Sequence, residues 1–337
     1  MKLVVLHGEV PEGAPPDETD VLVQVEAVSK ARARLGHECE TLTFSFDVKS
    51  AVDELLAKKP AVVFNLVESI GGLGQFIYIA PAVLDYLRLP YTGSSTEAMF
   101  LTSNKLAAKK ILKASGIRTT PWLSSDLTDT DLQGAEGRFI IKSVWEHASI
   151  GLRKDSVVCV ADVEDLRRRI ARRQDEFGRE CFAEVYIEGR EFNLSVLAGE
   201  DGPKVLPAAE IRFVSYPAGV PRIVDYDSKW NEQSFAYRHT PRSLDFPEKD
   251  NPLLRKLEST ATECWNLFGL RGYARVDFRV DREGQPWVLE INANPCISPD
   301  GGYVAAAKKA GLTFDAVVEA IVRDSLACPR HPAQTGQ

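Results

Sequence analysis

The chain has 337 residues, of which 44% are hydrophobic and 26% are charged, and its formal net charge is −7. This composition predicts a soluble globular protein of two or three lobes and excludes collagen-like and disordered chains, while the acidic balance argues against nucleic acid as a partner. No apolar run approaches the ~20 residues of a membrane span, and the six cysteines lack metal-ligand spacing, so we expect a cytoplasmic protein with free thiols and no membrane association.

The first 95 residues alternate between strand and helix patterns. Apolar runs at residues 2–6 and 61–66 predict buried strands, and the periodicity of residues 21–35 and 76–87 predicts helices. Strands that alternate with helices form a parallel sheet whose loops gather at the carboxyl ends of the strands. We therefore predict an N-terminal α/β domain over residues 1–95.

Two regions that are richer in strands follow. Residues 96–190 predict a small α+β lobe with a helix at 105–115, strands at 139–144, 156–160 and 181–187, and a charged helix at 163–177. Residues 191–327 predict a β-rich lobe with strands at 191–197 and 204–211, an irregular stretch at 214–247, a helix at 252–268, a β-hairpin at 272–292 and a helix at 313–326. The polar residues 328–337 predict a flexible tail.

The hairpin at residues 272–292 carries acidic residues in a regular alternation. We expect Trp287, Leu289 and Ile291 of its second strand to lie on the apolar face. A four-residue turn at 282–285 predicts that Asp281 lies opposite Pro286 and that Asp277 lies opposite Glu290. Asp277, Glu290 and Asn292 then share one face of the hairpin.

Carboxylate and amide oxygens are the ligands that suit Mg²⁺, and a cation allows two adjacent carboxylates to stay ionised. For the hairpin taken alone, a surface segment with scattered acids is the alternative. Other segments favour the metal site. Lys142 precedes a loop at residues 146–151 whose small residues let backbone N–H groups approach phosphate oxygens, and the acids Glu184 and Glu191 bracket a strand and turn.

The order of these segments resembles the ATP-grasp superfamily, and within it the D-alanine-D-alanine ligase family. The resemblance extends from Leu89 to Leu326 and rests on Ser103-Asn-Lys105, Phe139-Ile-Ile-Lys142, Glu184 to Glu191, Lys229, Arg275-Val-Asp277 and Glu290-Ile-Asn292-Ala-Asn-Pro295. It implies three subdomains, with ATP between two β-rich lobes and an N-terminal domain that helps to bind substrate. The implied reaction is phosphorylation of a carboxylate to an acyl phosphate, followed by attack of an amine.

The resemblance also implies roles for individual residues. The nucleotide would contact Lys105, Lys142, Glu184, Tyr186, Ile187, Glu191 and Leu289. Two divalent ions, Mg²⁺ or Mn²⁺, would be held by Asp277, Glu290 and Asn292. The catalytic residues would be Arg275, Lys229 and Ser149, with Lys229 on a mobile loop. The implied partners are a small carboxylate and a small amine, both amino acids or similar molecules, and a second copy of the chain in a homodimer.

The chain departs from the family pattern on the substrate side. Where the family carries a Ser-x-Glu-Arg-Glu-Val-Ser type motif, this chain has residues 9–18, in which Glu9 or Glu12 is the candidate acid. Glu68 stands where the family usually has histidine, and Trp230 stands where its catalytic tyrosine would align. Glu68, together with Glu9 or Glu12, is expected to face a cationic group of the substrate.

Two more departures lie close to the expected phosphates and second substrate. Ala148 replaces one of the family's two adjacent serines. After the hairpin, Gly301 and Gly302 are expected to offer backbone N–H groups to a substrate carboxylate. Since the nucleotide and metal residues match and the substrate residues differ, we expect a ligase with another acyl donor or amine. The alternatives are a true D-alanine-D-alanine ligase and a nucleotide-binding sensor without ligase activity.

Overall fold

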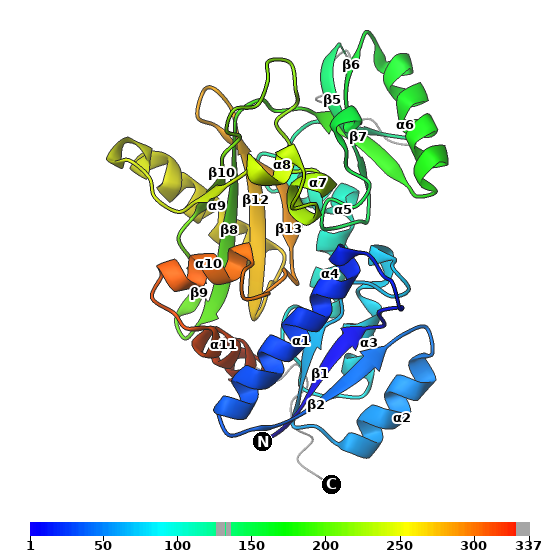
Figure 1. Cartoon of the computed structure of the whole chain (residues 1–337), viewed down its shortest axis with the longest axis vertical. Helices are drawn as coiled ribbons and strands as arrows, with labels where there is room; N and C mark the ends of the chain where they lie inside the picture. The colour runs from blue at the N-terminus through cyan, green and yellow to red at the C-terminus, as the bar shows by residue number, and fades with distance from the viewer. Residues whose placement is uncertain (126–131, 133–135, 328–337) are drawn as a thin grey trace.

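The computed structural model describes residues 1–125, 132 and 136–327 (Figure 1). The predicted tail at 328–337 lies outside the described residues. The described residues form three sheets, which lie in the N-terminal, middle and C-terminal parts of the sequence. In the described part of the chain, no helix is long and apolar enough to cross a membrane.

The N-terminal domain is built on a three-stranded parallel sheet with the strand order β2-β1-β3. Its elements are β1 (Lys2–Gly8), α1 (Pro16–Arg34), β2 (Glu38–Phe44), α2 (Val48–Lys58), β3 (Val62–Leu66), a 3₁₀ turn (Gly74–Phe76) and α3 (Ile79–Tyr86). Helix α1 begins five residues earlier than predicted, because Pro16 occupies its first turn together with Asp17 and Glu18, which complement the helix dipole. The patterns do not predict β2 or α2. Strand β2 is an edge strand in which only two residues, both apolar, are buried. It therefore has no continuous apolar run in its sequence.

The middle part contains a four-stranded antiparallel sheet with the order β4-β7-β5-β6. Its elements are α4 (Thr96–Ser103), α5 (Lys105–Ala114), β4 (Trp122–Ser124), β5 (Gly137–Ser143), a 3₁₀ turn (Lys154–Ser156), β6 (Val157–Val160), α6 (Val163–Phe177) and β7 (Cys181–Val185). Helix α6 buries only Leu166 and Ile170 against this sheet, and its arginines form ion pairs with acids at the surface. The basic run of α6 is therefore a solvated helix face.

The C-terminal part contains a six-stranded antiparallel sheet with the order β11-β10-β8-β12-β13, in which β9 also pairs with β8. Its elements are β8 (Arg190–Gly199), β9 (Gly202–Val205), β10 (Ala209–Ile211), α7 (Tyr226–Trp230), α8 (Phe235–Arg238), β11 (Arg242–Ser243), a 3₁₀ turn (Glu248–Asp250), α9 (Asn251–Leu267), β12 (Tyr273–Val280), β13 (Pro286–Asn292), α10 (Gly302–Lys309) and α11 (Phe314–Ala327). The predicted strand at 204–211 is two short strands. The predicted irregular stretch contains the short helices α7 and α8 and the strand β11.

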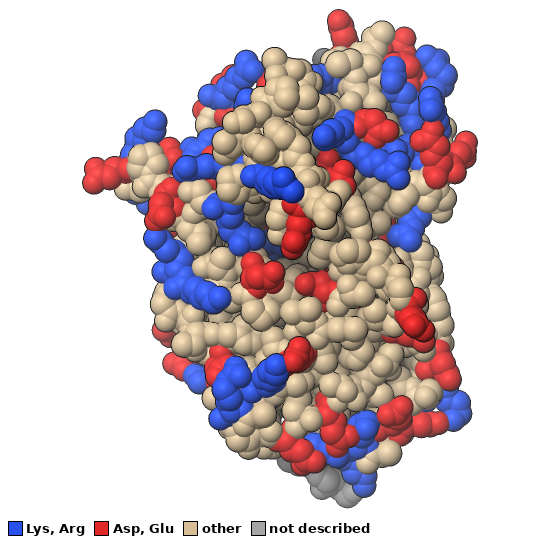
Figure 2. All heavy atoms as spheres, viewed as in Figure 1, with Lys and Arg blue, Asp and Glu red and all other residues tan. Residues whose placement is uncertain are grey.

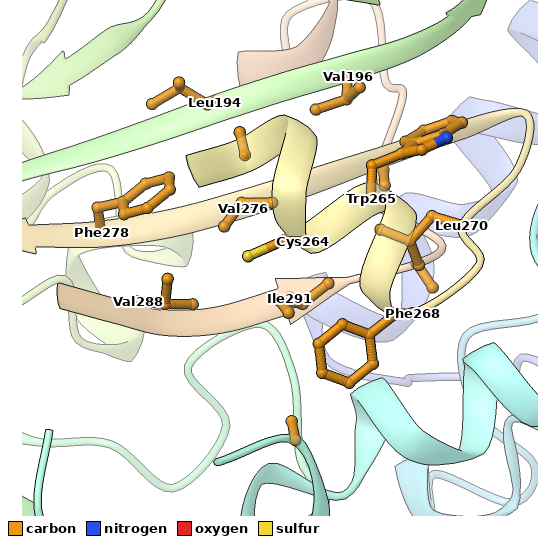
Figure 3. Packing of buried hydrophobic residues seen from close by; sticks show 14 of the residues in the cluster. Leu194, Val196, Cys264, Trp265, Phe268, Leu270, Val276, Phe278, Val288 and Ile291 are labelled. Atoms are coloured by element: carbon orange, nitrogen blue, oxygen red, sulfur yellow. The ribbon is translucent and has the colours of Figure 1, made fainter. Parts of the chain in front are cut away.

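One face of the six-stranded sheet is buried and holds the largest apolar cluster. Cys264 and Trp265 of α9, and Phe268 just after it, belong to one apolar cluster with Val276 and Phe278 of β12 (Figure 3). The opposite face carries the charged residues of β12 and β13. The alternation of strand side chains therefore aims the acids away from this core and toward the middle lobe.

The C-terminal helix α11 returns to the N-terminal domain. Its residues Val317 and Ile321 share an apolar cluster with Leu3 and Val28, and Figure 1 shows α11 beside α1. Burial of these side chains stabilises the contact between the two ends of the described chain.

The hairpin β12–β13 confirms one predicted pair and corrects another. Asp277 lies opposite Glu290 as predicted, but Val280 and not Asp281 lies opposite Pro286. The register shifts by one residue at Leu289, which is left without a partner as in a β-bulge. For the same reason the predicted apolar face of β13 is right for Ile291 but wrong for Leu289: Val288 enters the core with Ile291, whereas Leu289 turns toward the cavity.

Candidate active site

A cavity of about 590 Å³ lies between the four-stranded and six-stranded sheets. Every residue predicted for the site lines this cavity, except Glu9 and Glu12. Figure 2 shows basic and acidic side chains together around a hollow on this face of the molecule. The cavity therefore gathers charges of both signs in a protein whose net charge is negative.

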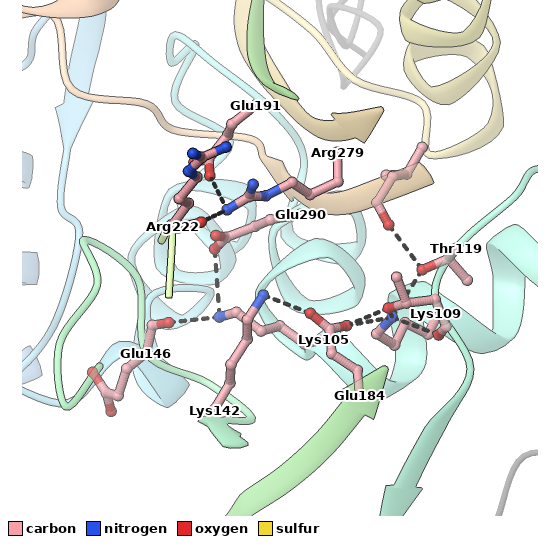
Figure 4. Close-up of polar contacts among 12 residues, drawn as sticks. Lys105, Lys109, Thr119, Lys142, Glu146, Glu184, Glu191, Arg222, Arg279 and Glu290 are labelled. Atoms are coloured by element: carbon pink, nitrogen blue, oxygen red, sulfur yellow. Dashed lines mark hydrogen bonds and ion pairs between the residues drawn. The ribbon is translucent and has the colours of Figure 1, made fainter. Parts of the chain in front are cut away.

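A buried carboxylate, Glu184 of β7, holds two lysines at one end of the cavity (Figure 4). Its oxygens lie 2.5 Å from Lys142 Nζ and 2.6 Å from Lys109 Nζ, and the hydroxyl of Thr120 donates to it at 2.7 Å. Burial opposes ionisation, but the two lysines lower the pKa of Glu184 to about 2. The carboxylate therefore stays charged and fixes the position of Lys142.

The sequence patterns do not single out Lys109. It lies one helical turn after Lys105 on α5, and residues four apart share one face of a helix. Both lysines are buried, which is rare for lysine without a partner. This spacing is the signal that would have predicted Lys109 as part of the site.

Glu290 of β13 forms a second cluster with Lys105 and His147. The Nζ atom of Lys105 lies 3.4 Å from Glu290 Oε1 and donates at 2.5 Å to the carbonyl of Glu146, while Nδ1 of His147 lies 2.8 Å from the same Oε1. Burial would raise the pKa of Glu290, but Lys105 and His147 hold it well below its ordinary value. The glutamate is thus ionised.

Asp277 lies beside Glu290 and is held by Arg275. The Arg275 guanidinium binds Asp277 through two hydrogen bonds, of 2.7 Å and 2.8 Å, and Asn193 donates to the same carboxylate at 2.7 Å. Burial disfavours the charge of Arg275, but Asp277 outweighs this effect and raises the pKa of Arg275. The pair keeps one cation and one anion fixed on the cavity face of β12.

The donor set of the hairpin fits a magnesium ion. Two carboxylates and the amide of Asn292, which pairs across from Arg275, lie on one face of the hairpin. Among the described residues, no group of three or more His, Cys, Asp or Glu side chains is arranged to hold a metal ion. The protein therefore offers few ligands at this place. Mg²⁺ is usually bound in this way, by one or two carboxylates with substrate phosphates and water as its remaining ligands.

The loop before β6 and the lid, which is the segment at residues 224–230 that contains α7, contact each other over the cavity. The hydroxyl of Ser149 donates to the carbonyl of Val224 at 2.7 Å, and Nε1 of Trp230 donates to the carbonyl of Ala148 at 3.1 Å. Ala148 and Ser149 have φ angles of 54° and 62°, a left-handed conformation that costs about 1 kcal/mol or more for a non-glycine residue. The structure thus maintains a strained loop at the place where the lid touches it.

Nearby on α7, Lys229 lines the cavity. Burial and the charge of Arg275 lower the pKa of Lys229. Tyr226, one helical turn earlier, donates from its hydroxyl to Asp17 of α1 at 2.6 Å. The lid therefore contacts both the middle lobe and the N-terminal domain.

The other end of the cavity contains acids from the N-terminal domain, but they are not all the predicted ones. Glu9 and Glu12 are exposed and do not line the cavity, because residues 9–15 run along the surface between β1 and α1. The acid that reaches the cavity is Asp20, from the second turn of α1. Glu68 lines the cavity as predicted.

Neutral donors hold these two acids. The amide of Gln24 donates to Glu68 at 2.8 Å and to Asp20 at 3.1 Å, and Ser298 donates to Asp20 at 2.8 Å. Burial raises the pKa of Glu68 to about 7. Burial also raises the pKa of Cys296, which contacts Asp20, so this thiol stays protonated and is not a nucleophile.

Comparisons with known proteins agree with this architecture. Residues 134–323 match the family described as "D-ala D-ala ligase C-terminus". The chain is 31% identical to a D-alanine-D-alanine ligase of a Synechococcus species, over 97% of this chain and 93% of that protein, and 29% identical to that of Aquifex aeolicus, over 96% and 100%.

Solved structures show the same fold. The D-alanine-D-alanine ligase of Bacillus anthracis, in a crystal structure complexed with ATP, aligns with a TM-score of 0.73 at 22% identity and covers 97% of this chain and 98% of its own. The fold is thus the ATP-grasp fold, as predicted. Since the sequence matches cover nearly the whole chain, this protein belongs to the D-alanine-D-alanine ligase family.

Proposed function

We propose that this protein is an ATP-dependent carboxylate-amine ligase that joins two amino acids or similar small molecules and releases ADP and phosphate. The observation that carries the proposal is one cavity in which Lys105 and Lys142 lie beside the paired acids Asp277 and Glu290. Phosphoryl transfer depends on positioning and charge neutralisation, which lysines and a metal on two carboxylates supply.

In this proposal the nucleotide lies against the middle lobe. Lys105 and Lys142 contact its phosphates, and the two lysines are already fixed by Glu290 and Glu184. Adenine lies among the side chains and backbone that line this end of the cavity, which include Glu184, Tyr186, Ile187 and Leu289. Glu191, which pairs with Arg279 at 3.0 Å, accepts hydrogen bonds from the ribose hydroxyls.

Asp277, Glu290 and Asn292 hold the divalent metal in this proposal, with two Mg²⁺ or Mn²⁺ ions as the expected number. When bound, the metal neutralises phosphate charge and polarises the phosphoryl group that is transferred. The protein residues contribute fixed oxygen atoms, and the ion pairs of Asp277 and Glu290 keep both carboxylates in place.

The proposed reaction has two steps. First, a carboxylate oxygen of the acyl donor attacks the γ-phosphorus of ATP, and the bond to the bridging oxygen of ADP breaks. Second, the amine nitrogen attacks the carbonyl carbon of the acyl phosphate, inorganic phosphate leaves and the nitrogen loses a proton. Arg275 and Lys229 line the cavity beside the hairpin, where their N–H groups stabilise the developing negative charge.

The lid protects the intermediate from water. An acyl phosphate hydrolyses if water reaches it, and a closed site prevents this side reaction. The contacts from Trp230 to Ala148 and from Ser149 to Val224 tie this lid to the middle lobe, and the contact from Tyr226 to Asp17 ties it to the N-terminal domain.

The substrate end favours a substrate that differs from the one the family name states. Asp20 takes the place expected for Glu9 or Glu12, and in this proposal it faces a cationic group of the substrate together with the predicted Glu68. Trp230 donates to the loop backbone, and an indole offers no hydroxyl to the substrate. A true D-alanine-D-alanine ligase is the second candidate, since the curated relatives carry that name.

The remaining expectations are part of the same proposal. The enzyme acts in the cytoplasm as a homodimer and has three subdomains, at residues 1–95, 96–190 and 191–327. Analytical ultracentrifugation of the purified protein tests the dimer, which a monomer at micromolar concentration would contradict.

A substrate panel tests the proposed function. The protein is incubated with ATP, Mg²⁺ and pairs of amino acids of both chiralities, phosphate release is measured, and products are identified by mass spectrometry. We expect a condensed dipeptide-like product with stoichiometric phosphate. Rapid turnover with D-alanine alone would identify the second candidate, and ATP binding with no ADP formation across the panel would contradict ligase activity.

A further inference from the structure

We propose that Arg242 determines the choice of the amine substrate by binding a carboxylate group that this substrate keeps throughout the reaction. The inference rests on the proposed ligase function and adds a substrate class to it: amines that carry a carboxylate, which are amino acids or peptides. Arg242 belongs to none of the segments that carry the family resemblance.

Arg242 lies on the edge strand β11 and lines the same cavity as Arg275 and the two glycines at the start of α10. A Cβ atom built on Gly302 would lie 3.3 Å from Nη2, 3.4 Å from Cζ and 3.4 Å from Nε of Arg242. Because the three atoms are almost equally distant, the plane of the guanidinium lies flat over Gly302. Glycine at this position makes room for the arginine.

The guanidinium of Arg242 differs from the neighbouring arginines in having no partner. In the described part of the chain, no hydrogen bond or ion pair engages it, whereas Arg275 binds Asp277 and Arg279 binds Glu191. Burial and repulsion by Arg275 lower the pKa of Arg242, and Asp300 offsets this only in part. An anionic ligand bound at Arg242 would offset this repulsion.

A carboxylate matches this corner of the cavity better than a single point charge does. The planar fork of a guanidinium binds a carboxylate through two parallel hydrogen bonds. Helix α10 begins at Gly302 and has no side-chain cap, so the N–H groups of its first turn face the same corner. Of the two N–H groups predicted for this corner, that of Gly301 donates to the carbonyl of Ser298 at 2.8 Å, so Gly302 is the glycine whose N–H group assists the arginine.

The sheet order separates this carboxylate from the one that is phosphorylated. Strand β11 is three strands away from β12, which carries Asp277, so their backbones lie about 14 Å apart at the usual strand spacing. The acyl donor's carboxylate must reach the γ-phosphate beside the metal hairpin. A carboxylate held by Arg242 therefore belongs to the amine and becomes the free carboxylate of the product.

Carboxamides test this assignment directly. An amino acid amide has no carboxylate to be phosphorylated, so it enters a product only as the amine. The full-length enzyme is assayed with each amino acid that the panel identifies as an amine substrate and with its amide, and kcat/KM is measured for both. We expect kcat/KM for the amide to be lower by about 10- to 100-fold, the loss typical of one charge-assisted pair.

Three variants complete the experiment. Arg242→Gln should raise KM for the amino acid by about 10- to 100-fold, leave KM for ATP unchanged and remove the preference over the amide. Gly302→Ala keeps the charge but displaces the guanidinium, so it should weaken the same preference. Arg212→Gln is the matched control, because Arg212 follows β10, is exposed and does not line the cavity.

The outcomes separate the two proposals. Equal kcat/KM for amino acid and amide in the wild type, or an unchanged preference in Arg242→Gln, would overturn the role of Arg242 while the ligase function stands. No condensed product from any pair would overturn both. Circular dichroism of each variant verifies folding, and a folded Gly302→Ala with the wild-type preference would also contradict the assignment.

Discussion

The two ends of the cavity balance their charges differently. At the proposed nucleotide end, which comprises Lys105, Lys142, Glu184, Asp277 and Glu290, every one of these side chains has an ion-pair partner within 3.4 Å. At the proposed substrate end, which comprises Asp20, Glu68, Arg242, Cys296 and Ser298, the acids are held by neutral donors and Arg242 has no partner among the described residues.

This difference shows in Glu184 and Glu68. Lysines lower the pKa of Glu184 to about 2, whereas removal of Glu68 from solvent, which Gln24 and Arg275 offset only in part, raises its pKa to about 7. The nucleotide end is therefore fixed by the protein's own ion pairs before any ligand binds. The substrate end has charges that remain for the substrate to balance, and it is there that this chain departs from the family pattern.

The largest effect is expected at the metal hairpin. Asp277→Asn removes half of the carboxylate charge that holds the metal in this proposal, so ADP formation should fall by roughly 1,000-fold. Glu283→Gln, on the exposed turn of the same hairpin, is the matched control and should stay within about twofold of the wild type. A folded Asp277→Asn enzyme with more than a tenth of wild-type activity would show that the hairpin does not hold the metal.

Replacement of the buried Lys109 should lower the stability of the fold. Lys109→Met leaves Glu184 with one lysine and should lower the free energy of unfolding by about 3–5 kcal/mol, the usual cost of breaking a buried ion pair. Urea denaturation measures this, with Lys110→Met on the exposed side of α5 as the control. Equal stability of the two variants would mean that Lys109 is not needed to balance Glu184.

A smaller effect is expected from Glu68 and depends on pH. The pKa of Glu68 is about 7 in the folded protein against a usual 4.5, so between these pH values the native state keeps a proton that the unfolded chain loses. The contribution of Glu68 to the free energy of unfolding is therefore lost as the pH rises from 4.5 to 7.

Glu68→Gln should remove this contribution, so its free energy of unfolding should fall less steeply over the same range. Urea denaturation at several pH values compares it with Glu12→Gln, an exposed site that should behave like the wild type. If the free energy of unfolding depends on pH in the same way in Glu68→Gln and in the wild type, Glu68 is not the group with the raised pKa.

The pairing of acids at the proposed nucleotide end could be predicted because its signals are local in sequence. Asp277 and Glu290 are brought together by one hairpin, whose polar alternation was sufficient to predict their pairing. The bulge at Leu289 was not predicted, since an extra residue in one strand leaves no mark on the alternation near Asp277. It nevertheless decides which side of β13 Leu289 faces.

The substrate end could not be predicted in the same way because it joins distant segments. Asp20 and Ser298 are 278 residues apart in the sequence, and the packing of α1 against the segment after β13 brings them into contact. Arg242 enters the cavity from a two-residue strand within a stretch that has no regular pattern. Tertiary packing and not local spacing places these residues, and the same holds for the contact between Tyr226 and Asp17.

The most direct test of the account is isotope transfer from the acyl donor. The enzyme is incubated with ATP, Mg²⁺, the accepted amine and an acyl donor whose carboxylate carries ¹⁸O, and the released phosphate is analysed by mass spectrometry. If an acyl phosphate forms, the oxygen that attacked the γ-phosphorus leaves with phosphate, so each product molecule should be accompanied by one ¹⁸O-labelled phosphate. Release of unlabelled phosphate alongside product would contradict the proposed mechanism.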